Sequence, residues 1–167
     1  MTRYWLTVHW PHPVIPAEDH PWDVYLQDRY KDKGAHLSVG DKVLFYETAK
    51  RKAQVKTGAG GTHRVVELKP GRRGVVCAAE VAAPLGRRPV EQAQAEYHDG
   101  THLNWAWQAR CSKHETGAVV PLEDVLHTIG RGGIRVPGGL LEISSAQFDD
   151  LKSRLIFGHA REQARSP

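Results

Sequence analysis

The residues that most strongly suggest a function are large aromatic side chains placed near the ends of expected strands. Trp10 ends an aromatic strand, Trp22 lies where a short helix is expected to start, and Tyr46 ends a second strand. Rings at strand ends can line a pocket, and the flat face of a nucleobase stacks on such rings. Two rings in a sandwich could hold a base that has been turned out of its stack. Packing at the edge of the hydrophobic core is the alternative for the same side chains.

Positive charge is concentrated in one segment. Residues 50–88 contain ten Lys and Arg against Glu67 and Glu80, a net charge of +8 in a chain whose total is +4. Glycines between these cations would let the backbone approach a polyanion, and each cation that reaches a phosphate makes binding depend on salt. A basic loop that only keeps the chain soluble is the alternative. The predicted phosphate-binding residues are Lys50, Arg51, Lys52, Lys56, Arg64, Arg72 and Arg73.

Length and composition limit the class of protein. A chain of 167 residues fits a single domain. Its two cysteines, Cys77 and Cys111, form no CxxC motif and no disulfide framework, which indicates a reducing compartment. No apolar run approaches the ~18 residues of a membrane span, and the start of the chain lacks the apolar core of a signal peptide. We therefore expect a cytoplasmic protein with no membrane partner.

The hydrophobic pattern predicts the elements that must position these side chains. We expect strands at residues 3–10, 42–46, 63–68, 74–81, 103–111 and 139–143. We expect helices at residues 22–30, at 121–129 with Gly130 as the stop, and after a capping box at 144–147. A basic hairpin or loop fills residues 49–74, and the tail from His159 is expected to fray. Because these elements do not alternate as βαβ units, they predict an α+β domain around a curved, mixed sheet.

Catalytic and metal-binding motifs are weak. The histidines between residues 98 and 114 match no standard zinc spacing, even with Cys111 included. The three residues from Glu67 to Lys69 are only a faint match to a metal-nuclease arrangement. The glycine-rich segment 58–63 lacks the Gly-Lys-Ser/Thr ending of a phosphate loop, and there is no GxSxG motif. We therefore expect no metal, no cofactor and no catalytic residue.

The order of these features resembles that of EVE domains, which belong to the PUA-like group together with YTH, ASCH and SRA domains. The resemblance is carried by residues 4–8, Trp22 and residues 39–46, and then by segments 74–84, 120–129 and 141–148. It implies a PUA-like curved mixed β-sheet or open barrel with flanking short helices. It further implies a single domain over residues 1–158, with a basic Gly-rich insertion at about 49–74 and a frayed tail at 159–167.

The resemblance also implies a pocket that accepts one base, often a modified one, in DNA or RNA. Trp10 and Trp22 fall near the wall of that pocket, Tyr46 and Thr48 near its floor, and Trp105 on a strand that could supply another wall. Polar neighbours of these residues would read the hydrogen-bonding edge of the base. The chain departs from the family in its proline-rich loop 11–16 and its long basic segment 49–73. The predicted pocket residues are Trp10, His12, Trp22, Asp23, Tyr46, Thr48, Asn104 and Trp105.

These expectations predict a non-enzymatic module that captures a flipped, modified base in an aromatic cage. Its partner would be DNA or RNA that carries the base, and a nuclease or other effector is a candidate further partner. An ASCH-like RNA-binding or RNA-processing protein with hydrolytic activity is the first alternative, and it would need Lys42, Glu47 or Lys50 to converge in the cleft. A protein-interaction module with an exposed aromatic patch is the second.

Overall fold

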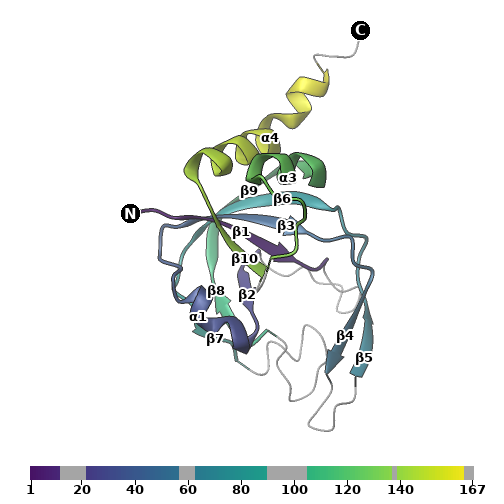
Figure 1. Ribbon diagram of the computed structural model, residues 1–167. Helices are drawn as coiled ribbons and strands as arrows, with labels where there is room; N and C mark the ends of the chain where they lie inside the picture. Colours follow the sequence, from purple (N-terminus) through teal and green to yellow (C-terminus); the bar gives the residue numbers. More distant parts are fainter. Residues whose placement is uncertain (12–21, 57–62, 90–104, 137–138, 164–167) are drawn as a thin grey trace.

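A five-stranded sheet forms the centre of the molecule in the computed structural model, which describes residues 1–11, 22–56, 63–89, 105–136 and 139–163 (Figure 1). Its strands lie in the order β10-β1-β3-β6-β9. β1 and β3 run parallel, and the other neighbouring pairs are antiparallel. The strands are β1 (Tyr4–His9), β3 (Lys42–Glu47), β6 (Gly74–Val81), β9 (Cys111–Pro121) and β10 (Leu140–Ile143). The α+β class with a mixed sheet is therefore confirmed.

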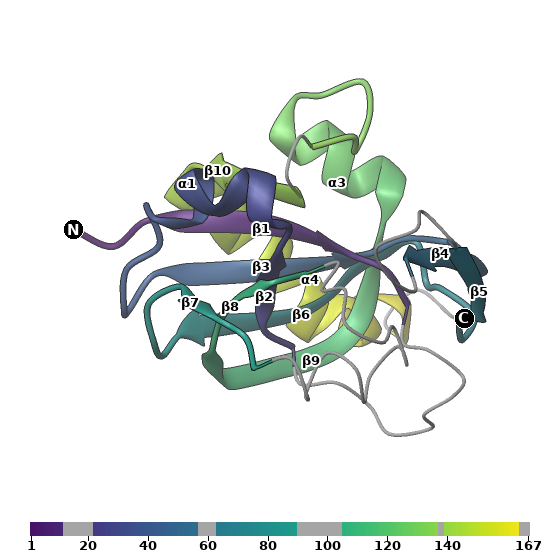
Figure 2. The ribbon, with the colours of Figure 1, turned by 90° about the horizontal axis from the view of Figure 1, so that it is seen from below.

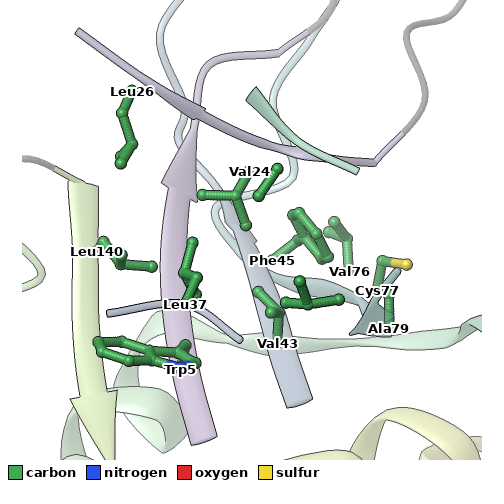
Figure 3. Close-up of a cluster of buried hydrophobic side chains, with 12 residues drawn as sticks. Trp5, Val24, Leu26, Leu37, Val43, Phe45, Val76, Cys77, Ala79 and Leu140 are labelled. Atoms are coloured by element: carbon green, nitrogen blue, oxygen red, sulfur yellow. The ribbon is translucent and has the colours of Figure 1, made fainter. Parts of the chain in front are cut away.

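Alternation along β1 and β3 divides the core between the two faces of this sheet. Leu6 and Leu44 face one side, where they pack with residues of α3 (Leu122–Ile129) and α4 (Ser145–Gln163). Trp5, Val43 and Phe45 face the other side and belong to a second buried cluster (Figure 3). Successive side chains of these strands therefore alternate between the two clusters.

A small sheet in the order β2-β8-β7 covers the second face, and α1 (Lys31–Gly34) lies beside it (Figures 1 and 2). Its strands are β2 (Val24–Leu26), β7 (Gly86–Arg87) and β8 (Trp107–Ala109). The prediction of one helix over residues 22–30 is wrong. Val24 and Leu26 are fully buried on either side of a half-buried Tyr25, which is the alternation of a strand, and a 3-10 turn (Asp28–Tyr30) follows.

The sequence predicts both ends of α3 and the start of α4 on the first face of the sheet. Pro121 precedes the first turn of α3, and Gly130 ends the helix with a left-handed φ of 67°. A capping box opens α4, because the Gln147 amide N–H donates to Ser144 Oγ at 3.1 Å and the Ser144 N–H donates to Gln147 Oε1 at 2.9 Å. α4 continues to Gln163, past the position where the tail is expected to fray.

A β-hairpin projects beside the sheet at the end of β3 (Figure 1). It consists of β4 (Lys52–Lys56) and β5 (His63–Glu67), paired antiparallel, and it confirms the predicted basic hairpin and its second strand. Its base has a buried cluster of its own, formed by Ala53, Val66 and Leu68, on which Trp10 and Trp105 pack. The basic segment is therefore held to the body of the protein by aromatic side chains.

The strand β9 is a second element, after β2, that the hydrophobic pattern does not predict. It is an edge strand of the central sheet, and the stretch from Lys113 to Thr116 is exposed and polar. Gly117 allows α4 to cross it closely, because a Cβ at this position would lie 2.2 Å from the Leu155 carbonyl oxygen. None of the described helices combines the length and the apolar character that a membrane crossing requires.

Candidate functional site

Aromatic and basic side chains from widely separated segments meet where β1 and β3 end. Figures 1 and 2 show these two strands side by side. The parallel pairing of β1 with β3 places both strand ends at the same edge, with His9 opposite Glu47. The segments that meet there contain residues 9–11, 22–25, 45–50, 71–73, 88 and 105–106. This edge of the sheet is the candidate site.

An imidazole lies at the centre of the first aromatic group. The His9 ring centroid is 5.6 Å from that of Trp22, 5.7 Å from Tyr25 and 5.3 Å from Phe45. Trp22 and Phe45 also contact each other, with ring centroids 5.7 Å apart. Of these four residues, only Trp22 is among the predicted pocket residues. The signal for the others was the strand pattern, since His9 and Phe45 belong to the same face of adjacent strands.

A second aromatic group joins the strand end to the hairpin. Trp10 and Trp105 meet edge to face, with centroids 4.6 Å apart and ring planes at 85°. A base between two parallel rings needs a separation of about 7 Å, which is twice the ~3.4 Å stacking distance. The contacts within Trp10–Trp105 and Trp22–Phe45 therefore leave no slot between the two rings. Each pair could offer only the outer face of a ring to a base.

A cation lies near three of the half-buried rings, and one of these cations, Arg88, is itself only 4% exposed. Lys50 Nζ is 3.8 Å from the centroid of the Trp10 ring, and the Arg72 guanidinium carbon is 5.8 Å from that of Trp22. The Arg88 guanidinium lies 4.6 Å from the Tyr25 ring. Such contacts stabilise a cation on a ring face. Partial burial lowers the pKa of the Lys50 ammonium, which agrees with its position against the indole.

Arg72 is held by a buried carboxylate at the end of β3. Glu47 is only 3% exposed, and it accepts hydrogen bonds from the Arg72 backbone N–H at 2.8 Å and from Nε and Nη2 at 3.0 Å each. Gly71 makes this approach possible, since a Cβ there would lie 1.8 Å from the Thr48 carbonyl oxygen. The two-pronged contact fixes the guanidinium plane, so that Arg72 is preorganised beside Trp22.

Two of the predicted pocket residues, Tyr46 and Asp23, are buried and contribute to the packing and hydrogen bonding of the fold. Tyr46 is 2% exposed in the core on the helical face, on the opposite side of the sheet from Phe45 and Trp22. Burial raises the pKa of its phenol. Asp23 is 4% exposed, and its carboxylate accepts hydrogen bonds from Gln108 Nε2 and from the Cys111 N–H, both at 2.7 Å. The structure does not bring Tyr46 together with the three indoles.

The remaining predicted residues fall into three groups. Thr48 lies at the site, where its N–H donates to the His9 carbonyl oxygen at 2.9 Å. Arg51, Lys52 and Arg73 are exposed around the base of the hairpin and the start of β6. His12 and Asn104 lie outside the described residues, as do the side chains of Lys56 and Arg64.

The catalytic alternative finds no support in the placement of its residues. Lys42 starts β3 and pairs with Glu80, whereas Glu47 ends the same strand, so that they are separated by about 17 Å of extended chain. Among the described residues, no group of three His, Cys, Asp or Glu could hold a metal ion. Burial raises the pKa of the Cys77 thiol to about 11 and that of Cys111 to about 12, which keeps both thiols protonated near neutral pH.

A hollow of about 700 Å³ lies elsewhere, between β9 and α4. Its charged side chains are paired with one another, since Arg154 contacts both Asp150 and Asp124. The aromatic and basic edge remains the stronger candidate, because it combines exposed rings with cations from several segments.

Comparison with solved structures places this fold among known ones. A hypothetical protein from Leishmania major matches with a TM-score of 0.55 and 17% identity, over 99% of this chain and 98% of that one. A mutant of ZmASCH from Zymomonas mobilis matches with a TM-score of 0.53 and 11% identity, over 92% of this chain and 96% of that one. No family model matches the sequence, and no curated protein does. The similarities show a PUA-like fold, as the sequence resemblance implies.

Human THYN1, whose structure is a complex with DNA containing 5-methylcytosine, matches with a TM-score of 0.49 and 10% identity, over 91% of this chain and 96% of that one. At this level of similarity, the complex describes THYN1 and does not identify a ligand for this chain.

Proposed function

We propose that the chain is a nucleic-acid-binding module of the EVE kind, and that the aromatic and basic edge at the ends of β1 and β3 is its interface. The observation that supports this most is the convergence of three half-buried indoles with the exposed cations Lys50 and Arg72. Rings that stack on bases and cations that contact phosphates are the two components of single-strand recognition. DNA or RNA with an unstacked base is the proposed ligand.

The ring contacts refine how a base would be held. Because the described indole pairs touch, we propose that a base stacks on the outer face of one indole rather than entering a two-ring sandwich. Trp22 is our choice for this role, since it is half-buried and has Arg72 fixed beside it. Stacking of this kind contributes about 1–3 kcal/mol per base, and the neighbouring guanidinium would contact the phosphate or the base edge.

Preference for a modified base rests on the resemblance to EVE domains. We propose that His12, Thr48 and Asn104 contribute to reading the base edge, and that a nuclease or other effector acts on the nucleic acid that the module binds. We further propose a cytoplasmic location, which suits the free thiols of Cys77 and Cys111.

Binding titrations with matched variants test the proposed division of labour. Trp22→Ala should weaken binding by about 5- to 150-fold, the equivalent of the stacking energy, and should abolish any preference between methylated and unmodified oligonucleotides. Arg72→Ala should weaken binding to both by the same factor, because phosphates carry no sequence information. Trp107→Ala is the control, since its indole N–H donates to Asp28 Oδ1 away from the strand ends and its loss should leave binding unchanged.

Two outcomes would contradict this model. If Trp22→Ala and Arg72→Ala changed affinity and base preference in the same way, stacking and phosphate contact would not be separate functions. If the unmodified protein bound no DNA or RNA at about 50 mM salt, where phosphate contacts are strong, the interface would serve another ligand.

A further inference from the structure

A second group of cations lies on the other side of β1. Arg131 and Arg135 are exposed in the segment that leaves α3 at Gly130 and leads to β10. Arg131 Nη2 donates to the Arg135 carbonyl oxygen at 3.4 Å, so the segment turns back toward itself. Within the described part of the chain, neither guanidinium forms an ion pair with a carboxylate. Both charges are therefore exposed without a counter-charge from the residues that the structure describes.

Lys33 of α1 adds a third positive charge beside this segment. Its pKa is lowered, first by partial burial and second by the nearby charge of Arg131. Like charges placed close together repel each other. An anion bound between them would attract both charges, and planar guanidinium groups bind phosphate through paired hydrogen bonds.

The glycines between the two arginines have no structural explanation of their own. A Cβ at Gly132 or Gly133 would meet no atom within 4 Å. Neither residue has a positive φ, unlike Gly130 and Gly139. Glycine at such positions leaves the backbone N–H groups open to close approach by a ligand. The segment therefore combines uncompensated guanidinium groups with an accessible backbone.

Strand order places this group on the opposite side of the aromatic edge from the first group of cations. β10 begins beside the end of β1, because Leu140 pairs with Thr7 and a Cβ at Gly139 would lie 3.4 Å from the Val8 carbonyl oxygen. On the other side of β1 come β3 and β6, which carry Lys50 and Arg72 at their ends. By strand order, the end of β1 and Trp10 after it thus lie between the two basic groups.

We propose that Lys33, Arg131 and Arg135 form a second phosphate-binding site, contacted by the same nucleic acid whose base lies at the aromatic edge. This inference rests on the proposed function and specifies its ligand as a polynucleotide rather than a free base or nucleotide. β10 and β6 are three strand spacings apart, about 14 Å. That distance corresponds to about four steps of ~3.4 Å in a helical strand, so a ligand shorter than this cannot reach both basic groups.

The test compares Arg131→Ala/Arg135→Ala with Arg110→Ala/Lys113→Ala, which removes the same number of charges at the opposite end of the central sheet, where Cys111 pairs with Val81. Each protein is titrated with an oligonucleotide of about 12 nucleotides and with a dinucleotide, at salt concentrations between about 50 and 200 mM. Single-stranded DNA, single-stranded RNA and duplex arms identify the preferred polymer.

We expect the first variant to lower the slope of log affinity against log salt for the longer ligand, by about 0.7 per lost contact on a single strand or about 0.9 on a duplex. Dinucleotide affinity should not change, and the control should behave like the unmodified protein. If the unmodified protein binds and both variants keep its slope, the second site is wrong while the aromatic edge stands. If the unmodified protein binds none of these ligands, the proposed function itself is wrong.

Discussion

Charged side chains at the candidate interface are positioned by contacts that differ in strength. Arg72 is fixed by a fork of hydrogen bonds to the buried Glu47, whereas Lys50 lies on Trp10 through a single ring contact. Guanidinium groups lose less freedom when they bind a planar anion than a flexible ammonium does. We therefore expect Arg72 to define the geometry of a bound phosphate and Lys50 to adapt to it.

Asp23 offers a direct test of whether a predicted pocket residue is structural. Asp23→Ala would leave the Cys111 N–H and the Gln108 amide without their acceptor, which costs about 1–3 kcal/mol for each unsatisfied group. Asp23→Asn keeps one acceptor oxygen and should cost less. Urea unfolding measures both changes. A variant that keeps full stability but loses discrimination among bases would instead assign Asp23 to base reading.

The cysteines predict how stability depends on alkaline pH. In the folded chain the pKa of Cys77 is about 11 and that of Cys111 about 12, both raised mainly by burial from an ordinary value of 9.0. Because the folded state holds these protons more tightly, the stabilisation is complete below pH 9 and is lost as pH rises from about 9 to 12. Each pKa unit corresponds to about 1.4 kcal/mol. Cys77→Ala should flatten this part of the stability profile, and a profile unchanged by the substitution would contradict the assignment.

Residue identities alone predicted part of the site. Trp10, Trp22 and Trp105 do lie at one edge with Lys50 and Arg72, as their positions after strands and in a basic segment indicate. Tyr46 was grouped with them because it also ends a strand. Alternation puts it on the opposite face from Phe45, however, and the apolar surface below α3 and α4 takes up its ring. Strand alternation indicates that His9 and Phe45 share a face. The contacts of His9 with Trp22 and Tyr25 come from a segment that is distant in the chain, and no local pattern predicts them.

At the scale of elements, the short crossing from Leu68 to Gly74 orders the basic side of the interface. It passes so close to the end of β3 that only glycine fits at position 71, and Arg73 follows with a φ of 51°. A left-handed φ at a non-glycine residue is uncommon and costs free energy. Gly71 and Arg73 therefore turn the chain at this point, and the turn allows Arg72 to form its hydrogen bonds with Glu47.

A pair of glycine substitutions tests this crossing. Gly71→Ala should destabilise the protein by about 1–3 kcal/mol, as overpacking does, and should weaken nucleic-acid binding although no charge is removed. Gly86→Ala is the matched control, because open space surrounds that position and the expected change is within about 0.5 kcal/mol. Thermal or urea unfolding and a parallel binding titration measure both effects. Equal stability of the two variants would show that the crossing can shift without cost.

Elements with local signals were predictable, and those defined by distant partners were not. The cap of α3 at Gly130 and the Ser144–Gln147 box of α4 follow from adjacent residues. β2 has only three residues and becomes a strand because β8 and the Asp23 hydrogen bonds hold it there. β9 gains its strand identity from pairing with β6, and its exposed edge position removes the alternation that would have revealed it.

For the molecule as a whole, stability is divided unequally between the central sheet and the hairpin. The sheet is buried on both faces by two large clusters, whereas among its described side chains the hairpin base has three buried residues, with Trp10 and Trp105 against them. Hydrogen exchange should therefore show β4 and β5 opening at a lower free energy than β3 and β6, whose amides should exchange only on global unfolding. Uniform protection would show that the hairpin and the body unfold together.

Some global features of the fold were predictable from the sequence, and the strand order was not. Composition and the spacing of apolar segments suffice for a single α+β domain with a mixed sheet, because burial of alternating faces requires it. The order β10-β1-β3-β6-β9 joins segments that are far apart in the chain, and the resemblance to PUA-like domains implied a curved mixed sheet without specifying this order.

The pairing of β1 with β10 has a consequence for biosynthesis. Tyr4 pairs with Ile143, so β1 leaves the ribosome well before β10, the strand that covers its outer edge. Until then the nascent chain carries an unpaired edge that can join other chains, a hazard that chaperones limit. Closure of this long loop also slows folding, and a premature stop before β10 would release a product prone to aggregation.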